Sequence, residues 1–428
     1  MTLATVLAGA ALVLSGGTVI DGYGNAPIPD GIIVIEGDRI LAVGGPGQVA
    51  IPEGAEVVST EGMTVLPGLW DMQVDLMRLG HGDARRWNET YGPLAERVVM
   101  PIAARQLLQA GVTSARDVAA PLEAATRVRT RVREGIIDGP SLYVAGPALR
   151  KLAVANTAAW QWEVEGAPDV RAKVQRLANA GVDYVLIADL ELWSAEELES
   201  VVSESRIRGL PVHAYAEKPA DVVRGAAAQL DGFLGTIAGA GPYPAEMMQA
   251  ITGRLTQAGA RPLAWTPAIS APLNLESLRL NDEPLDDPRA TQQLPELVAA
   301  DVKGSLAGLS SALPEPPAAP ALCGKLRQLD EAKVLLLLGS GAGESGHLHS
   351  RATWQEIDFW VRDCGLPAVR AIRAATHDAA TAMGVGHESG AISPGKIADI
   401  IAVRGDVLRD PGLLQSVDVV IKRGRRVR

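Results

Sequence analysis

The chain has 428 residues, 47% of them hydrophobic and 4% aromatic, and a formal net charge of −10. This length suits one large α/β barrel with a small additional domain, or two to three average domains. The acidic balance argues against a nucleic-acid binder, because phosphate contacts need a basic face. No segment has the ~20 uninterrupted apolar residues that span a bilayer, so no membrane partner is expected.

The first 17 residues are apolar, but no Lys or Arg precedes Arg39, whereas a secretory signal peptide begins with a basic region. The apolar run also continues into residues 17–22, which are typical of a strand. We therefore expect a mature N-terminal strand and a cytoplasmic protein, with secretion as the alternative. Cys323 and Cys364 are expected to be two buried free thiols rather than a disulfide.

Short apolar runs punctuated by glycine predict β-strands at both ends of the chain. A turn is expected at Gly16–Gly17 and a hairpin at Gly37–Asp38. The simplest arrangement is one small β-sandwich formed by residues 1–66 and 391–428, with residues 67–390 inserted between its two parts. The expected strands are 11–14, 18–20, 32–35, 39–43, 56–59, 63–66, 397–403, 417–422 and 425–427.

Between residues 67 and 390 the apolar runs alternate with helical patterns, which predicts an α/β fold with a (β/α)8 TIM-like barrel. Residues 313–321 are proline-rich and are expected to form a stiff loop. The expected strands are 69–76, 111–117, 142–145, 184–187, 212–215, 232–234, 261–267 and 334–338. The expected helices include 168–180, 194–208, 351–364 and 366–383.

Residues 67–75 read Pro-Gly-Leu-Trp-Asp-Met-Gln-Val-Asp. This stretch resembles the Pro-Gly-Leu-x-Asp-x-His-x-His motif of the amidohydrolase superfamily, in its imidazolonepropionase-like and Xaa-Pro-dipeptidase-like branch. Residues 16–22 and 393–400 resemble the sandwich motifs of the same family, so the resemblance extends over about residues 10–428. It implies a barrel inserted in a discontinuous β-sandwich, and a homo-oligomer.

The resemblance also implies a catalytic divalent metal. In the family, strand one supplies two His, strand four a carboxylated Lys, strands five and six one His each, and strand eight an Asp that also acts as general base. Here only His213 on strand five keeps its type, and an open catalytic zinc site needs three protein ligands. We therefore expect no metal cofactor. The other positions hold Gln73, Asp75, Leu186, a glycine within residues 231–235, and Gly341.

His213 is the best remaining candidate for acid–base chemistry, because an imidazole titrates near neutral pH. Asp75 could orient it as the carboxylate of a dyad. Alternatively, His213 is a leftover residue in a repacked barrel mouth. Histidines 347 and 349 could form a new metal pair, but loop histidines at the substrate rim are favoured. The expected substrate-binding residues are Gln73, Arg116, Tyr143, Tyr215, Trp265, His347 and His349.

Three functions follow from these observations. The first is a divergent amidohydrolase homologue without the metal-dependent site, which binds a small molecule at the barrel mouth or catalyses metal-free acid–base chemistry. The second is a hydrolase of amide or peptide C–N bonds, of the dipeptidase or cyclic-amide type, with a rebuilt metal site. The third is a pseudoenzyme that acts through oligomerisation.

Overall fold

A computed structural model describes residues 11–152, 155–237, 239, 241–257, 259, 261–273, 294–307 and 318–428. The predicted loop 313–321 lies partly outside these residues, and Ala319–Ala321 belong to a helix instead. The chain divides into two compact units. One contains the residues up to Trp70 together with Gln109–Thr113 and Pro367–Arg428, and the other contains Asp71–Leu108 and Ser114–Leu366.

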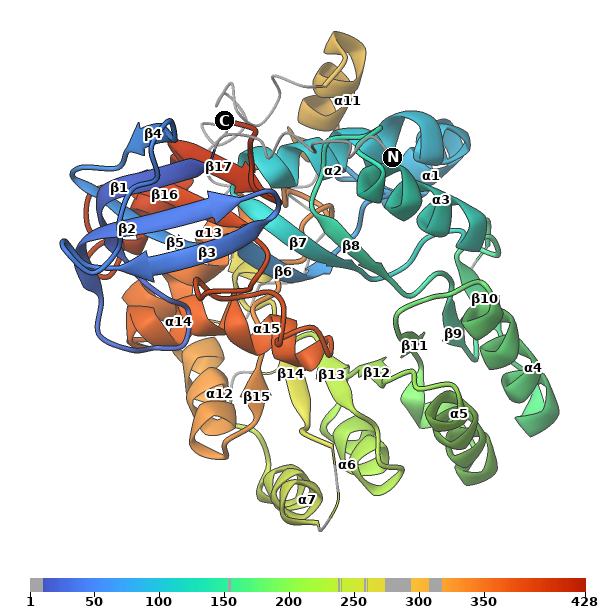
Figure 1. Cartoon of the computed structure of the whole chain (residues 1–428). Coiled ribbons are helices and arrows are strands. Elements are labelled where there is room, and N and C mark those ends of the chain that lie inside the picture. The colour runs from blue at the N-terminus through green and yellow to red at the C-terminus, as the bar shows by residue number, and fades with distance from the viewer. Residues whose placement is uncertain are drawn as a thin grey trace, which may run out of the picture. The chain divides into compact units, whose positions relative to one another are not determined.

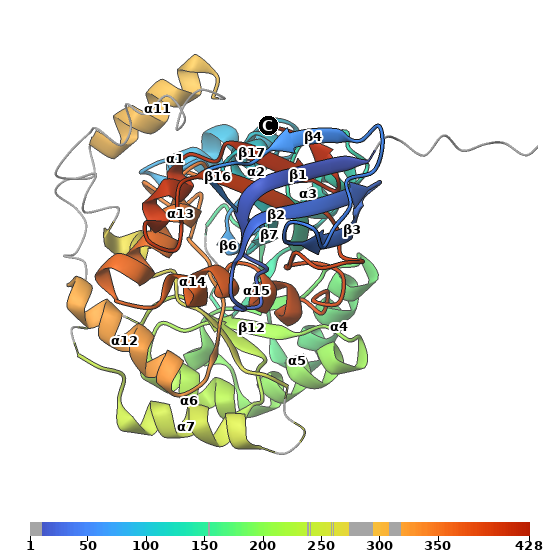
Figure 2. The same cartoon turned by 60° about the vertical axis from the view of Figure 1, so that its left-hand side comes forward.

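The first unit is built on a mixed sheet of strands from both termini. Its order is β18-β17-β16-β5-β1-β2-β3, with β4 paired to β1, and the antiparallel pair β5–β16 joins the two ends of the chain. Figure 2 shows β1 and β2 near β16 and β17. As predicted, strands from both termini belong to one unit, and here they form one continuous hydrogen-bonded sheet. They are β1 (Leu12–Val19), β2 (Ile28–Glu36), β3 (Arg39–Gly44), β4 (Glu56–Ser59), β5 (Met63–Pro67), β16 (Ile400–Arg404), β17 (Val419–Lys422) and β18 (Arg425–Arg426).

The glycine pair in β1 is not the predicted turn. A single strand runs through it, and its register with β2 shifts on both sides of Gly17. Gly16 has a φ of 98°, which favours glycine, and a Cβ on Gly17 would lie 2.8 Å from the Thr60 hydroxyl oxygen. The pair therefore forms a bulge that keeps the strand continuous.

The second unit contains parallel strands in the order of a barrel. Its ladders are β6-β7-β8 and β10-β9-β11-β12-β13-β14-β15. A parallel bridge between Val74 and Ala342 connects the first strand to the segment after the last one. Figure 1 shows α5, α6 and α7 outside β11–β14. The predicted fold class, α/β with a TIM-like barrel, is confirmed. The strands are β6 (Leu69–Val74), β7 (Val112–Asp117), β8 (Ser141–Val144), β9 (Ala148–Arg150), β10 (Gln161–Glu163), β11 (Val185–Ile187), β12 (Val212–Tyr215), β13 (Gly232–Leu234), β14 (Ala264–Thr266) and β15 (Leu335–Leu336).

The helices follow the predicted apolar patterns, with one difference near the end. Helix α5 begins at a capping box between Ser194 and Glu197. The single helix expected over 366–383 is two, because Thr376 leaves the helical conformation and its hydroxyl donates to the Ile372 carbonyl. The helices are α1 (Ala84–Tyr91), α2 (Met100–Gln109), α3 (Leu122–Arg133), α4 (Gly166–Asn179), α5 (Ala195–Ile207), α6 (Pro219–Ala227), α7 (Ala245–Thr256), α11 (Glu296–Ala307), α12 (Ala319–Glu331), α13 (Ala352–Asp358), α14 (Ala368–Ala374) and α15 (His377–Ala382), with a π-helical turn η5 (Phe359–Asp363) directly after α13.

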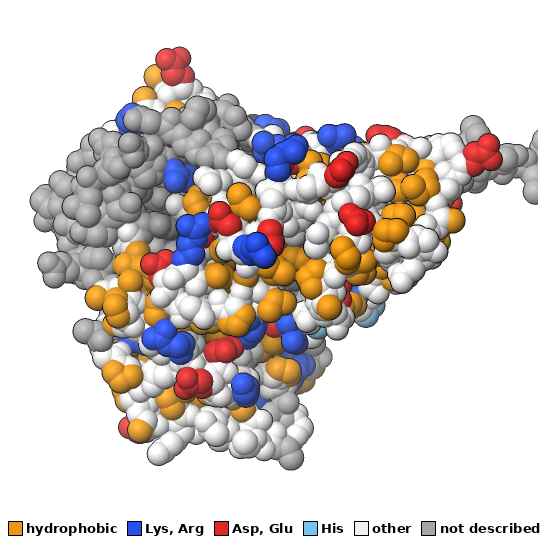
Figure 3. Space-filling model, turned by 90° about the vertical axis from the view of Figure 1, so that its left-hand side faces the viewer, with side chains coloured by type: hydrophobic (Ala, Val, Ile, Leu, Met, Phe, Trp, Pro, Cys, Tyr) orange, Lys and Arg blue, Asp and Glu red, His pale blue; other side chains and the backbone are white. Residues whose placement is uncertain are grey.

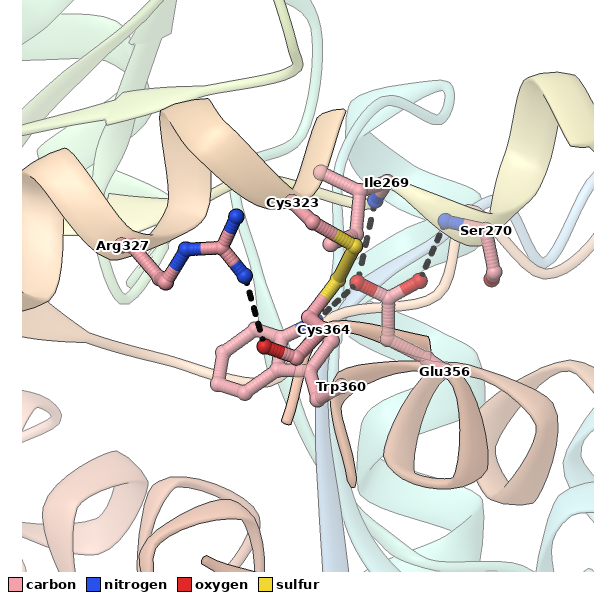
Figure 4. Close-up of a disulfide and its surroundings, with 7 residues drawn as sticks. All are labelled: Ile269, Ser270, Cys323, Arg327, Glu356, Trp360 and Cys364. Atoms are coloured by element: carbon pink, nitrogen blue, oxygen red, sulfur yellow. Dashed lines mark hydrogen bonds between the residues drawn. A yellow bond between two sulfur atoms is a disulfide. The ribbon is translucent and has the colours of Figure 1, made fainter. Parts of the chain in front are cut away.

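The two cysteines form a disulfide, so the prediction of free thiols is wrong. Cys323 lies in α12 and Cys364 follows η5, and their Cα atoms are 4.7 Å apart, a separation that a disulfide spans. Figure 4 shows this bridge with Arg327, which donates to the Cys364 carbonyl oxygen at 3.0 Å. The cysteines are 41 residues apart in sequence, so only the folded barrel brings them together.

The surface shows no large patch of one charge on the face drawn in Figure 3, where Lys and Arg side chains lie among Asp and Glu side chains. Among the described helices, none is both long enough and apolar enough to cross a membrane.

Candidate functional site

A buried arginine crosses the interior of the barrel. Arg116 in β7 is fully buried and donates from Nε to the Met72 carbonyl oxygen at 2.8 Å. Its Nη2 donates to Thr266 Oγ1 at 3.0 Å, and its Nη1 lies 3.2 Å from His213 Nδ1. The guanidinium therefore connects β7 with β6, β14 and β12.

The contact with Arg116 decides the tautomer of His213. A guanidinium has only donors, so His213 Nδ1 must accept and the neutral ring carries its proton on Nε2. Burial, and after it the charge of Arg116, lowers the pKa of His213 well below its usual value. His213 is thus a neutral hydrogen-bond donor at neutral pH. In this tautomer Nε2 carries the proton, and Nδ1 is already occupied by the contact with Arg116.

A glycine makes room for this pair. A Cβ on Gly232, in the neighbouring strand β13, would lie 2.6 Å from His213 Nδ1, which no real side chain tolerates. The Arg116 guanidinium also lies 5.1 Å from the centre of the Tyr184 ring, at a distance typical of a cation–π contact. The small residue and the aromatic face together hold the arginine inside the barrel.

The interior beside this pair is filled with apolar side chains. Leu186, where the resemblance leads one to expect a lysine, packs in a buried cluster with Tyr184 and Leu234. The Cα of Leu186 pairs with that of His213 across the parallel ladder, so the two side chains lie on the same face. A leucine here offers no metal ligand. The other buried members of the cluster are Val118, Ala145 and Ala148.

Asp71 is a structural carboxylate below the mouth. Ser340 Oγ donates to it at 2.5 Å, Thr353 Oγ1 at 2.7 Å, and the Ser340 and Gln73 backbone nitrogens at 3.0 and 3.1 Å. Burial raises the pKa of Asp71, and these hydrogen bonds oppose the rise. The carboxylate ties β6 to the loop after β15 and to α13.

A second group of polar side chains lies at the carboxyl ends of the strands, where barrel enzymes carry their sites. Asp75 follows β6, accepts from the Met77 backbone nitrogen at 2.9 Å and pairs with Arg78 at 3.2 Å. Burial and the Asp75 charge raise the pKa of Glu344 to about 7, while Arg78 and a hydrogen bond from Gln73 oppose the rise. The same acidic neighbours, after burial, raise the pKa of Tyr215 well above its usual value.

Asp117 at the end of β7 is a further buried acid. Its Oδ1 accepts from the Leu76 backbone nitrogen at 3.0 Å, whereas its Oδ2 has no hydrogen-bond partner in the described part of the chain. Burial, supplemented by the Asp75 charge, raises the pKa of Asp117 to about 8. This carboxyl group is therefore mainly protonated at neutral pH.

The two predicted rim histidines are buried. His347 lies between the carbonyl oxygens of Ser340 and Ala271, at 3.0 and 3.1 Å from its two nitrogens. Burial lowers the pKa of His347 to about 4, so the ring is neutral and donates to only one of these carbonyls. His349 is fully buried, neither ring nitrogen bonds a described residue at normal geometry, and burial lowers its pKa to about 3.

The predicted site residues thus fall into separate groups. Arg116 and His213 lie together, and Tyr143 pairs with Arg116 in the β7–β8 register. In the structure Asp75 pairs with Arg78, and His213 contacts Arg116. The dyad of the two residues stays a prediction.

Trp265 does not join either group. Its side chain lies on the outward face of β14. There its Nε1 donates to the Gly235 carbonyl oxygen at 2.9 Å, and its ring centre lies 5.2 Å from that of Phe233. The alternation of β14 explains this placement, because the neighbouring Thr266 points inward to Arg116.

Sequence reasoning missed Glu344, Arg78 and Thr266. Glu344 had a visible signal, since a carboxylate stands three residues after Gly341, the position where the family motif has its Asp. The partnership of Arg116 with Thr266 had none, because it depends on strands far apart in the chain. Within the described part of the chain, no three His, Cys, Asp or Glu side chains are grouped so that they could hold a metal ion.

Comparisons with known proteins are consistent with this fold. The sequence model of the amidohydrolase family matches residues 326–427. A solved Xaa-Pro dipeptidase with bound methionine superposes with a TM-score of 0.77 at 23% identity, over 97% of this chain and 99% of that one. Phenylurea hydrolase B gives 0.76 at 20% identity, over 98% and 97%. The ochratoxinase of A. niger gives 0.74 at 18%, over 97% and 95%. No curated protein matches the sequence.

Proposed function

We propose that the chain is a divergent amidohydrolase homologue that lacks the metal centre of the family and binds a small molecule at its barrel mouth, where protein side chains alone exchange protons. The family match over residues 326–427 and the likeness in fold to an Xaa-Pro dipeptidase, a phenylurea hydrolase and an ochratoxinase support the kinship. The chemistry is argued from the side chains, because a fold alone does not carry a reaction.

The residues at the expected ligand positions do not fit a divalent metal. Leu186 offers no ligand atom, and Gly235 and Gly341 offer no side chain. His213 is the one position that keeps its type, and its Nδ1 already accepts a hydrogen bond from Arg116. This hydrogen bond is the observation that carries the proposal.

Charge strengthens the argument from geometry. Two unit charges 4 Å apart at an effective dielectric constant of 20 interact with about 4 kcal/mol, so a dication beside the guanidinium would be opposed by roughly twice that energy. A rebuilt site would need Asp75, His213 and the pair His347 and His349, but Asp75 bonds Arg78 and His347 lies between two backbone carbonyls. We therefore do not favour the rebuilt metal site.

Partners and compartment belong to the same proposal. We propose a small-molecule ligand and a homo-oligomer, with neither nucleic acid nor membrane as partner. Because Cys323 and Cys364 are bridged and disulfides persist mainly in oxidising compartments, we propose such a compartment in place of the cytoplasm.

Metal content tests the central claim. Elemental mass spectrometry of the dialysed protein, prepared without added metal, should find zinc well below one atom per chain. In a ¹⁵N-histidine-labelled sample, His213 should show an unprotonated Nδ1 that added zinc does not shift, and His213→Gln identifies that signal. About one retained zinc per chain, the content of an open three-ligand site, would overturn the proposal.

Ligand binding is tested separately. Thermal-shift screening with dipeptides and cyclic amides, the compound classes that the resemblance suggests, should yield at least one stabilising compound. If the ligand reaches the Nε2–H donor of His213, His213→Ala should weaken that stabilisation. A full screen without any stabilising compound, on a well-folded sample, would argue against a ligand site of this class.

A further inference from the structure

The loop after β15 folds back onto the end of β6. The Gly341 backbone nitrogen donates to the Gln73 carbonyl oxygen at 2.9 Å, and the Glu344 nitrogen closes a turn on the Gly341 carbonyl oxygen at 3.1 Å. Gly343 has a φ of 99°, and a Cβ there would lie 2.2 Å from the Asp75 carbonyl oxygen. The backbone path through residues 341–344 therefore depends on glycine.

This path returns the Glu344 carboxylate to the place of the missing aspartate. A Cβ built on Gly341 would lie 3.5 Å from both Cδ and Oε2 of Glu344. Such a Cβ would carry the carboxylate of an aspartate at residue 341. The Glu344 carboxylate thus lies next to the place where the carboxylate of an aspartate at residue 341 would start, although the two residues are three apart in sequence.

Glu344 differs from the other buried acids in how its oxygens are used. Glu356 also has a pKa raised by burial to about 7. However, its oxygens accept from the Ile269 and Ser270 backbone nitrogens at 3.0 and 2.7 Å and from Trp360 Nε1 at 2.7 Å (Figure 4). Asp71 accepts four hydrogen bonds and is fully buried. Glu344 is less buried as a residue than either of them, and its carboxylate accepts a side-chain hydrogen bond from Gln73.

The neighbours of Glu344 keep it close to the balance between its two protonation states. Asp75 disfavours the carboxylate form, while Arg78 and Gln73 favour it. A group with a pKa near the working pH is the most effective general acid or base, because both of its forms are populated.

We propose that Glu344 is the carboxylate that exchanges protons with a ligand at the barrel mouth, in place of the aspartate that the family motif has at residue 341. This inference rests on the proposed function. With an amide ligand, Glu344 takes a proton from water as the water oxygen bonds to the carbonyl carbon. It then passes that proton to the amide nitrogen as the C–N bond breaks. Water is the only co-reactant, and Glu344 returns to its starting state.

The titration of Glu344 is measurable without any ligand. In ¹³C-glutamate-labelled protein, the carboxyl signals of two residues should titrate near pH 7, and Glu344→Gln and Glu356→Gln should each remove one of them. Asp75→Asn should lower the titration midpoint of Glu344 and leave that of Glu356 in place. A Glu344 signal that titrates near pH 4 to 5, as exposed glutamates do, would overturn the inference.

Turnover separates this inference from the proposed function. Chromogenic anilides and p-nitrophenyl esters serve as probes, with Glu199→Gln on the exposed face of α5 as the matched control. Glu344→Gln should lower turnover by about 100-fold or more while a ligand that stabilises the wild type still binds, and Glu344→Asp should retain part of the activity.

Each outcome has one meaning. If the wild type binds and cleaves a probe and Glu344→Gln does so equally well, the inference about Glu344 fails and the proposed function stands. If Glu344→Gln loses binding together with turnover, Glu344 is a binding anion and its proton-exchange role is overturned. If the wild type binds nothing, the proposed function fails and the titration alone decides about Glu344.

Discussion

Removal of the disulfide should destabilise the barrel by a predictable amount. The bridge closes a loop of 41 residues, which contains β15, the loop with Glu344, and α13. Restricting the unfolded chain by a loop of this length stabilises the folded state by about 4 kcal/mol in the chain-entropy description. Both sulfurs lie in buried residues, so two serines at these positions add the cost of buried hydroxyl groups.

Urea unfolding measures this effect. The double variant Cys323→Ser, Cys364→Ser should have a free energy of unfolding about 4 kcal/mol below that of the wild type. A reductant should lower the free energy of unfolding of the wild type but not that of the double variant. A thiol assay on the denatured, unreduced wild type should find no free thiols. Two free thiols per chain, or equal unfolding midpoints for wild type and double variant, would refute the reasoning.

Two further changes test the barrel mouth. Burial raises the pKa of Asp117 from 3.8 to about 8, so the folded state retains a proton that the unfolded state releases, and stability through this group falls as the pH rises from about 4 to about 8. Asp117→Asn keeps the acceptor for Leu76. In urea unfolding, the free energy of unfolding of the variant minus that of the wild type should be larger at pH 8 than at pH 5. An equal difference at the two pH values would contradict this. Gly343→Ala should cost more than about 2 kcal/mol, because its Cβ would lie 2.2 Å from the Asp75 carbonyl oxygen, whereas Gly209→Ala, also at positive φ but in open space, should cost only about 1 kcal/mol in the same assay.

Most strands could be predicted from the sequence because their signals are local. Apolar runs bounded by glycine define β2 and β3, and alternation with helices defines the barrel. The breaks in these patterns were harder to predict. The bulge at Gly16–Gly17 looks like a turn from composition alone, and the helix break at Thr376 depends on one side-chain hydrogen bond to Ile372.

The site was less predictable because its contacts join distant strands. Nothing local in the sequence indicates that His213 contacts Arg116 while Asp75 contacts Arg78. The alternation of side chains along β14 separates Trp265 from the group around Arg116, since Thr266 and Trp265 point to opposite faces of the strand. The disulfide left no trace in the cysteine spacing, because its two ends meet only after the barrel closes.

The mixed sheet of the first unit has a consequence for synthesis on the ribosome. Strand β5 ends at Pro67, whose partner in β16 is Ile400, so about 330 residues must be made before this edge of β5 is paired. At 5–20 residues per second this takes roughly 20 to 70 seconds. During that time β1–β5 present an open edge, which is a template for wrong pairing between nascent chains. Slower translation or a shortage of chaperones should therefore reduce the yield of soluble protein without any change in its final stability.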